Sequence, residues 1–109
     1  METFDLIING FEYKNCSIVG TNYTNPRNKA LKIMNQDSLI AVASVNVEEE
    51  LEDDCIAIKN WSENIDMDNE LKRVGIIEDC ILKYIPSGFV KIPVYYLTDK
   101  GKRLFKKRG

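Results

Sequence analysis

Histidine is absent from the 109-residue chain. This absence removes the commonest general base of enzymes, the commonest zinc ligand and every Cys–His or Ser–His catalytic pair formed within one chain. Glycine-rich phosphate loops and CxxC pairs are also lacking, as are the GxSxG and HExxH patterns of hydrolases and metalloproteases. The sequence therefore predicts a protein that is not an enzyme and that uses no cofactor.

Two pairs of neighbouring acidic residues are the remaining candidates for chemistry by paired carboxylates. They are Asp53-Asp54 and Glu78-Asp79. Because adjacent side chains of an extended backbone point to opposite faces, neither pair is expected to converge in one site. We therefore expect neither pair to be catalytic.

Cysteine is scarce, and long apolar runs are missing. The three cysteines, Cys16, Cys55 and Cys80, are widely spaced, and their odd number favours free thiols over a disulfide framework. Cys80 lies in an apolar stretch that is expected to be a strand, where burial would make its thiol inert. No run approaches the roughly 20 apolar residues of a membrane span, and the first residues lack the pattern of a signal peptide. We expect a cytoplasmic protein with no membrane partner.

Neither sign of charge dominates the composition. The net charge is −2, with 44% hydrophobic and 29% charged residues, which is close to the average for globular domains. Such a balance gives no overall attraction to nucleic acid or to an anionic membrane. The length is typical of one domain, so we expect a single domain over residues 1–109.

Alternating apolar residues predict strands over most of the N-terminal half. The expected strands cover residues 4–8, 11–19, 30–34 and 39–47, and a further short strand covers residues 55–58. In the fourth strand, residues 39, 41, 43, 45 and 47 share one face. Ala41 and Ala43 on this face are small, which indicates that another element, most simply a helix, packs closely there.

Residues 65–74 have the clearest helical pattern in the chain. Met67, Leu71 and Val74 form one apolar stripe. Asn64 or Asp66 can cap the N-terminus of this helix, and Gly75 suits the left-handed position just after its end.

A long hairpin is expected to follow, with strands over residues 76–85 and 89–97. Pro86 suits the first central position of its turn, and Gly88 suits the left-handed position that follows. Pro93 cannot donate to a strand ladder, so its strand should be an edge strand or contain a bulge. The predicted fold class is therefore α+β, with an antiparallel sheet of about five to seven strands, one principal helix and room for a short C-terminal helix.

Acidic residues are concentrated in the seven positions 48–54, which hold six of the seventeen acids. They are Glu48, Glu49, Glu50, Glu52, Asp53 and Asp54. Such a run would repel itself within a strand, so we expect an exposed loop. The run has neither the alternation nor the glycine of a calcium loop. It is either a solubilising loop or a contact surface for a basic protein partner.

Basic residues gather in the C-terminal tail, residues 98–109, which holds six of the fifteen in the chain. They are Lys100, Lys102, Arg103, Lys106, Lys107 and Arg108. A tail of this kind can bind the phosphates of nucleic acid, and it can equally be a frayed, solubilising terminus. Leu104 and Phe105 could attach it to the body of the protein.

Two family resemblances bear on the function. Residues 94–104, preceded by residues 71–77, are similar to the wing and adjoining helix of winged-helix DNA-binding domains. That domain needs three helices before its wing, whereas residues 1–58 have almost entirely strand patterns. The chain also resembles the DUF4313-like small proteins of mobile genetic elements and phages of gut bacteria. The matching residues are 45–47, the acidic run, 55–60, 69–71, 75–78 and 86–94.

The second resemblance implies an α+β fold and an origin in a mobile element, and it carries over no catalytic residue. Small acidic proteins of mobile elements are similar, as a group, to inhibitors of host defence such as anti-CRISPR proteins. We therefore expect a non-catalytic binding protein whose acidic surface contacts a basic, nucleic-acid-binding protein of the host or of the element. A DNA-binding regulator that uses the basic tail and a protein with a structural role remain alternatives. The sequence leaves the oligomeric state open.

Overall fold

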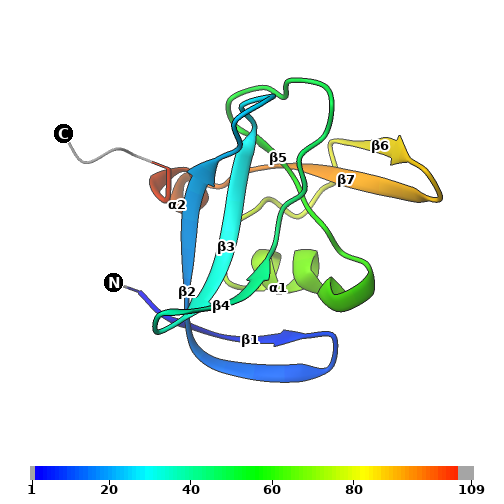
Figure 1. The fold of residues 1–109 in the computed structure, drawn as a ribbon. Coiled ribbons are helices and arrows are strands. Elements are labelled where there is room, and N and C mark those ends of the chain that lie inside the picture. The colour runs from blue at the N-terminus through cyan, green and yellow to red at the C-terminus, as the bar shows by residue number, and fades with distance from the viewer. Residues whose placement is uncertain (1, 106–109) are drawn as a thin grey trace.

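Four antiparallel strands from the first half of the chain form one sheet in a computed structural model, which describes residues 2–105 (Figure 1). They are β1 (Phe4–Ile8), β2 (Phe11–Asn22), β3 (Lys29–Asn35) and β4 (Ser38–Val42), in the order β1-β2-β3-β4. Alternation sets the faces of this sheet: Leu6 and Ile8 are buried in the core, whereas Ile7 between them is half exposed.

The second sheet has three antiparallel strands in the order β5-β7-β6. They are β5 (Cys55–Ala57), β6 (Lys83–Ser87) and β7 (Val90–Tyr96). The β6–β7 hairpin projects from the body of the molecule (yellow to orange in Figure 1). The predicted α+β class is confirmed, with the strands divided between two sheets.

Helix α1 (Met67–Arg73) packs between the edge strand β1 and the central strand β7 (Figure 1). Met67 and Leu71 are fully buried, and Val74 packs against the same core, as the apolar stripe predicted. At the outer edge of β1, Glu70 accepts a hydrogen bond from the backbone N–H of Ile7, and Arg73 donates one to the carbonyl oxygen of Asp5. These side chains cover an edge that would otherwise offer unpaired backbone groups.

The start of α1 differs from the prediction by two residues. A short 3-10 helix, η1 (Ser62–Asn64), comes first, and Asp66 has a left-handed φ of 71°. Asp66 is the N-terminal cap residue, but its side chain makes no capping hydrogen bond. Asn64 is not a cap, because its buried amide instead donates to the carbonyl oxygen of Val42 at 2.7 Å. Gly75 has a φ of +81°, so the left-handed position after the helix is confirmed.

The predicted long hairpin is much shorter in the structure. Its first strand, β6, begins at Lys83, and residues 78–82 form a bend and irregular chain. Ser87 pairs with Val90, so the two central residues of the turn are Gly88, with a φ of +59°, and Phe89. The turn assignment to Pro86 is therefore wrong, since Pro86 lies within β6 opposite Lys91.

Pro93 lies in a central strand, so the expected edge strand is also wrong. The strand β7 pairs with both β5 and β6. The last β5 pair joins Ala57 to Val94, and beyond it the carbonyl oxygen of Pro93 accepts a hydrogen bond from the N–H of Ile58 at 3.0 Å. Pro93 is tolerated because it lies at the end of the β5 ladder, where its carbonyl oxygen alone takes part in the pairing.

The predicted strand over residues 39–47 ends early, at Val42. Ala43 and Ser44 are both buried, although strict alternation would place only one of them inside. Ser44 turns inward because its hydroxyl accepts a hydrogen bond from the N–H of Leu31 and is joined to the hydroxyl of Tyr23, both at 3.0 Å. The shared face predicted for residues 39–47 is therefore broken, and Leu39 is 54% exposed.

The short C-terminal helix is confirmed as α2 (Asp99–Arg103). The Thr98 hydroxyl accepts a hydrogen bond from the N–H of Gly101 at 3.0 Å, which caps the helix. Leu104 and Phe105 pack against the main core, as the sequence indicated. Gly101 is buried so closely against the carbonyl oxygen of Ile76 that a Cβ atom there would overlap it. The helix is thus docked through a position where only glycine fits.

Tyr95 joins the second sheet to α1 through a buried hydrogen bond. Its hydroxyl donates to a carboxylate oxygen of Asp68 at 2.7 Å, and the same oxygen accepts from the amide of Asn60 at 3.1 Å. Burial, together with the hydrogen bond to the Asp68 carboxylate, raises the pKa of Tyr95 well above its ordinary value. The folded state therefore favours the neutral phenol.

Replacing Tyr95 with phenylalanine is expected to lower the free energy of unfolding by about 1–3 kcal/mol at neutral pH, because Asp68 loses a buried partner. The stability that comes from a phenol with a raised pKa is complete below the unfolded pKa of about 10 and is lost as the pH rises further. The difference between wild type and Tyr95→Phe should thus shrink in urea unfolding above about pH 10. A difference that stays constant from neutral to alkaline pH would contradict this assignment.

Candidate functional site

The acidic residues predicted as a contact surface lie on a loop that one buried side chain holds in place. We call residues 48–54 the acidic segment. Asn28 is 4% exposed, and its amide donates to the carbonyl oxygen of Glu49 at 3.0 Å and to Asn46 at 3.1 Å. Its side-chain oxygen accepts from the N–H of Leu51 at 2.8 Å. Asn28 therefore holds the backbone of the acidic segment in place, and the acidic side chains face outward.

All six acidic side chains of the segment are exposed, which confirms the predicted exposed loop. Three of them form ion pairs with lysines from distant parts of the chain. The pairs are Glu49–Lys83 at 2.8 Å, Asp53–Lys29 at 3.0 Å and Asp54–Lys102 at 3.6 Å. The hydrogen bond to Glu49 also raises the pKa of Lys83. Half of the predicted contact residues therefore already form ion pairs within the chain.

The other three acids, Glu48, Glu50 and Glu52, have no ion pair within residues 2–105. Six carboxylates and three paired lysines leave a local net charge of −3. Ion pairs between exposed side chains contribute little to stability. A partner's cation can therefore pair with the free carboxylates of Glu48, Glu50 and Glu52 without disturbing the fold.

Two of the three thiols are buried, and the third is not. Burial raises the pKa of Cys55, and the neighbouring carboxylates of Glu52 and Asp54 raise it further. Burial, with a smaller contribution from Asp5, also raises the pKa of Cys16. The prediction of a buried Cys80 is wrong, because Cys80 lies exposed in the bend before β6. All three cysteines are free, as expected.

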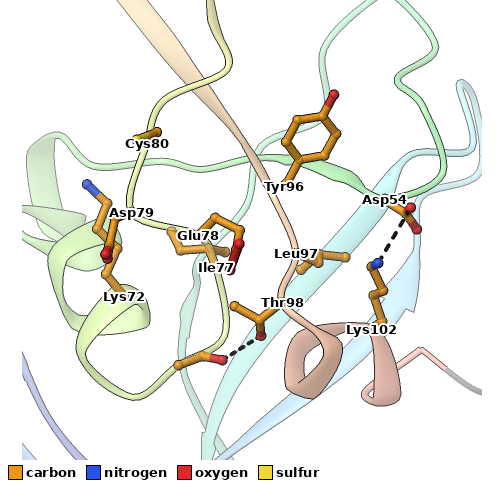
Figure 2. A pocket seen from close by; sticks show the side chains of 11 residues that line it. Asp54, Lys72, Ile77, Glu78, Asp79, Cys80, Tyr96, Leu97, Thr98 and Lys102 are labelled. Carbon is orange, nitrogen blue, oxygen red and sulfur yellow. Dashed lines mark hydrogen bonds and ion pairs between the residues drawn. The ribbon is translucent and has the colours of Figure 1, made fainter.

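Two of the predicted tail lysines are engaged with acidic side chains. Lys100 pairs with Glu2 at 3.0 Å, and Lys102 lies between Asp54 at 3.6 Å and Asp99 at 3.8 Å. Arg103 is exposed and has no ion pair within the described residues. The predicted site residues Lys106, Lys107 and Arg108 lie outside the described part of the chain. The two alternative sites, acidic and basic, therefore meet at the Asp54–Lys102 pair (Figure 2).

A cavity of about 730 Å³ lies beside this pair, between the end of α1, the bend before β6 and the start of α2 (Figure 2). Glu78 and Asp79 both line it. The expectation that they face opposite sides assumed an extended strand, whereas the chain bends at residues 79–80. Lys72 and Lys102 also line the cavity, so its charge is mixed. Among residues 2–105, no three acidic or thiol side chains are grouped closely enough to hold a metal ion.

No protein-family model, curated protein sequence or solved structure matches the chain. The resemblance to DUF4313-like proteins therefore stays a prediction. Within the described residues, neither helix has the length and apolar character needed to cross a membrane.

The sequence did not single out Asn28 or Asp68, although both are central to the arrangement. Asn28 follows a run of turn-forming residues, and Asp68 lies outside the apolar stripe of its helix. Their partners are far away in the chain: Asn28 binds residues 46–51, and Asp68 binds Asn60 and Tyr95. Only the folded chain brings these groups together.

Proposed function

We propose that this chain is a non-catalytic binding protein of a phage or mobile element, which inhibits a host-defence protein in the manner of anti-CRISPR proteins. Its acidic segment binds the basic surface on which that partner holds nucleic acid. The proposal is supported chiefly by the way Asn28 fixes the segment while Glu48, Glu50 and Glu52 stay exposed and unpaired. Carboxylates carried on a fixed backbone can occupy the positions of phosphates at a smaller entropic cost than those on a flexible loop.

Neutralising the three unpaired acids is expected to weaken binding to such a partner at least tenfold, which is about 1.4 kcal/mol. The variant is Glu48→Gln, Glu50→Gln and Glu52→Gln, and it should also flatten the dependence of affinity on salt. Binding is measured with a purified nucleic-acid-binding effector of a bacterial defence system at several salt concentrations. The unfolding free energy should stay within about 0.5 kcal/mol of the wild type, because these side chains are exposed.

The matched control changes the net charge by the same amount elsewhere on the surface. It carries Glu12→Gln, Asp37→Asn and Glu78→Gln, whose side chains are all exposed. This control should keep the partner affinity of the wild type. Equal weakening by both triple variants would mean that net charge alone, and not the acidic segment, attracts the partner.

The DNA-binding alternative predicts the opposite pattern. Changing Lys106, Lys107 and Arg108 to glutamine would then abolish binding to duplex DNA and lower the salt slope by about one unit for each phosphate that the tail no longer binds. The acid-to-amide variant would bind DNA more tightly than the wild type. Tight duplex binding that depends on these three residues would overturn the proposal.

A further inference from the structure

Two open cavities lie between the acidic segment and the β6–β7 hairpin. The larger, of about 640 Å³, is lined on its apolar side by Val45, Val47, Ile85, Pro86 and Ile92. The smaller, of about 400 Å³, is lined on its apolar side by Leu51, Cys55, Leu82, Val94 and Tyr96. Glu49 lines both, so the cavities adjoin. We call the two together the acidic groove.

The apolar lining of the acidic groove is an incompletely covered part of the core. Val47, Cys55, Ile92 and Val94 belong to the smaller of the two buried clusters, and Val45, Leu51 and Ile85 pack against it while only partly buried. A ligand that fills the groove would remove the exposed parts of Val45, Leu51 and Ile85 from water, which favours binding.

The rim of the groove is strongly acidic. Glu48 and Glu49 line the larger cavity, and Glu49, Glu50 and Glu52 line the smaller. Among the described residues, the one basic side chain in either lining is Lys83, whose ammonium group donates to Glu49 at 2.8 Å. This pair shows, within the chain itself, the contact that a partner's lysine or arginine would make at the rim.

We propose that the acidic groove binds a basic, amphipathic peptide segment of a protein partner, in which arginine or lysine alternates with leucine, isoleucine or valine. This inference rests on the proposed function, because it takes the acidic segment to be a contact surface. It adds that the partner's chain lies in the acidic groove and carries alternating basic and apolar side chains. The apolar side chains enter the two cavities, and the basic ones pair with Glu48, Glu50 and Glu52. Lys83 and Pro86 on β6 disfavour simple strand pairing at that edge.

The probe is a short, fluorescein-labelled peptide in which arginine and leucine alternate, titrated with the full chain and followed by anisotropy. One matched peptide replaces leucine with serine, and another replaces arginine with glutamate. The Arg–Leu peptide should bind about tenfold more tightly than the Arg–Ser peptide, because only leucine can enter the cavities. The Glu–Leu peptide should not bind, because the rim repels it.

Ile85→Ser is expected to weaken Arg–Leu binding about tenfold and to leave Arg–Ser binding unchanged. Tyr84→Ser is the matched control, since Tyr84 is 54% exposed and its side chain points to the other face of the hairpin. Lys83→Met should strengthen Arg–Leu binding a few-fold, because it frees Glu49 for the peptide. If Ile85→Ser does not fold, Leu82→Ser serves the same purpose, because Leu82 lines the smaller cavity and is 42% exposed.

The outcomes separate this inference from the function on which it rests. Equal binding of the Arg–Leu and Arg–Ser peptides, both abolished in the triple acid variant, would keep the acidic segment as a binding surface and overturn the groove. Arg–Leu binding that survives in the triple acid variant would overturn both. A self-association of the chain that Ile85→Ser abolishes would assign the groove to a second copy and overturn the peptide proposal.

Discussion

Replacing Leu71 with alanine is expected to lower the free energy of unfolding by about 2–5 kcal/mol. Leu71 is fully buried at the centre of α1, within the core cluster that joins both sheets to the helix. Truncation removes buried apolar atoms and leaves a cavity between α1 and the sheets, and both effects favour the unfolded chain. Urea unfolding followed by far-ultraviolet circular dichroism measures the change.

The control for this substitution is Ile65→Ala, just before α1, where the side chain is 47% exposed. It should cost less than about 1 kcal/mol, because little buried surface is removed. A loss below about 1 kcal/mol for Leu71→Ala itself would mean that α1 is not docked against the sheets.

Replacing Gly101 with alanine is expected to destabilise the protein by about 1–3 kcal/mol. The same substitution at an ordinary helix position stabilises a protein. Within an exposed helix, glycine to alanine gains roughly 0.5–1 kcal/mol. At Gly101 the added Cβ would overlap the carbonyl oxygen of Ile76 and lie 3.1 Å from a methyl group of Leu97. A backbone oxygen cannot rotate away as a side chain can, so α2 must shift.

Differential scanning calorimetry of Gly101→Ala measures this loss, and Lys102→Ala in the same helix is the control. Lys102 is partly exposed and contributes only surface ion pairs, so its replacement should change stability by less than about 1 kcal/mol. A stabilised Gly101→Ala variant would show that α2 can move off Ile76 without cost.

Local patterns were sufficient for much of the fold and insufficient where distant groups decide the conformation. The apolar stripe of α1 and the left-handed Gly75 follow from spacing and residue type, and the structure has both. The apolar residues after Gly75 have the same pattern as a strand, but Ile76 and Ile77 are drawn into the main core while Cys80 is left outside. Both isoleucines are buried and the chain bends after them, and no periodicity in the sequence distinguishes this arrangement from a strand.

For the candidate site, the sequence predicts the exposure of the acids but not their ion pairs. A run of like charges predicts its own exposure, and the six acids are exposed. The sequence could not show that Lys29, Lys83 and Lys102 pair with half of them, because these lysines come from three separate elements. The distinction between paired and free carboxylates, on which the proposed experiments depend, exists only in the folded chain.

The Asp54–Lys102 pair links the acidic segment to the basic helix α2. A cationic partner that takes Asp54 releases Lys102, and a phosphate that takes Lys102 releases Asp54. Thermodynamic reciprocity makes these two effects equal, so ligands of opposite charge would promote each other's binding. Because both side chains are partly exposed, the coupling is limited to the about 0.2–1 kcal/mol of a surface ion pair, which is at most about fivefold in affinity.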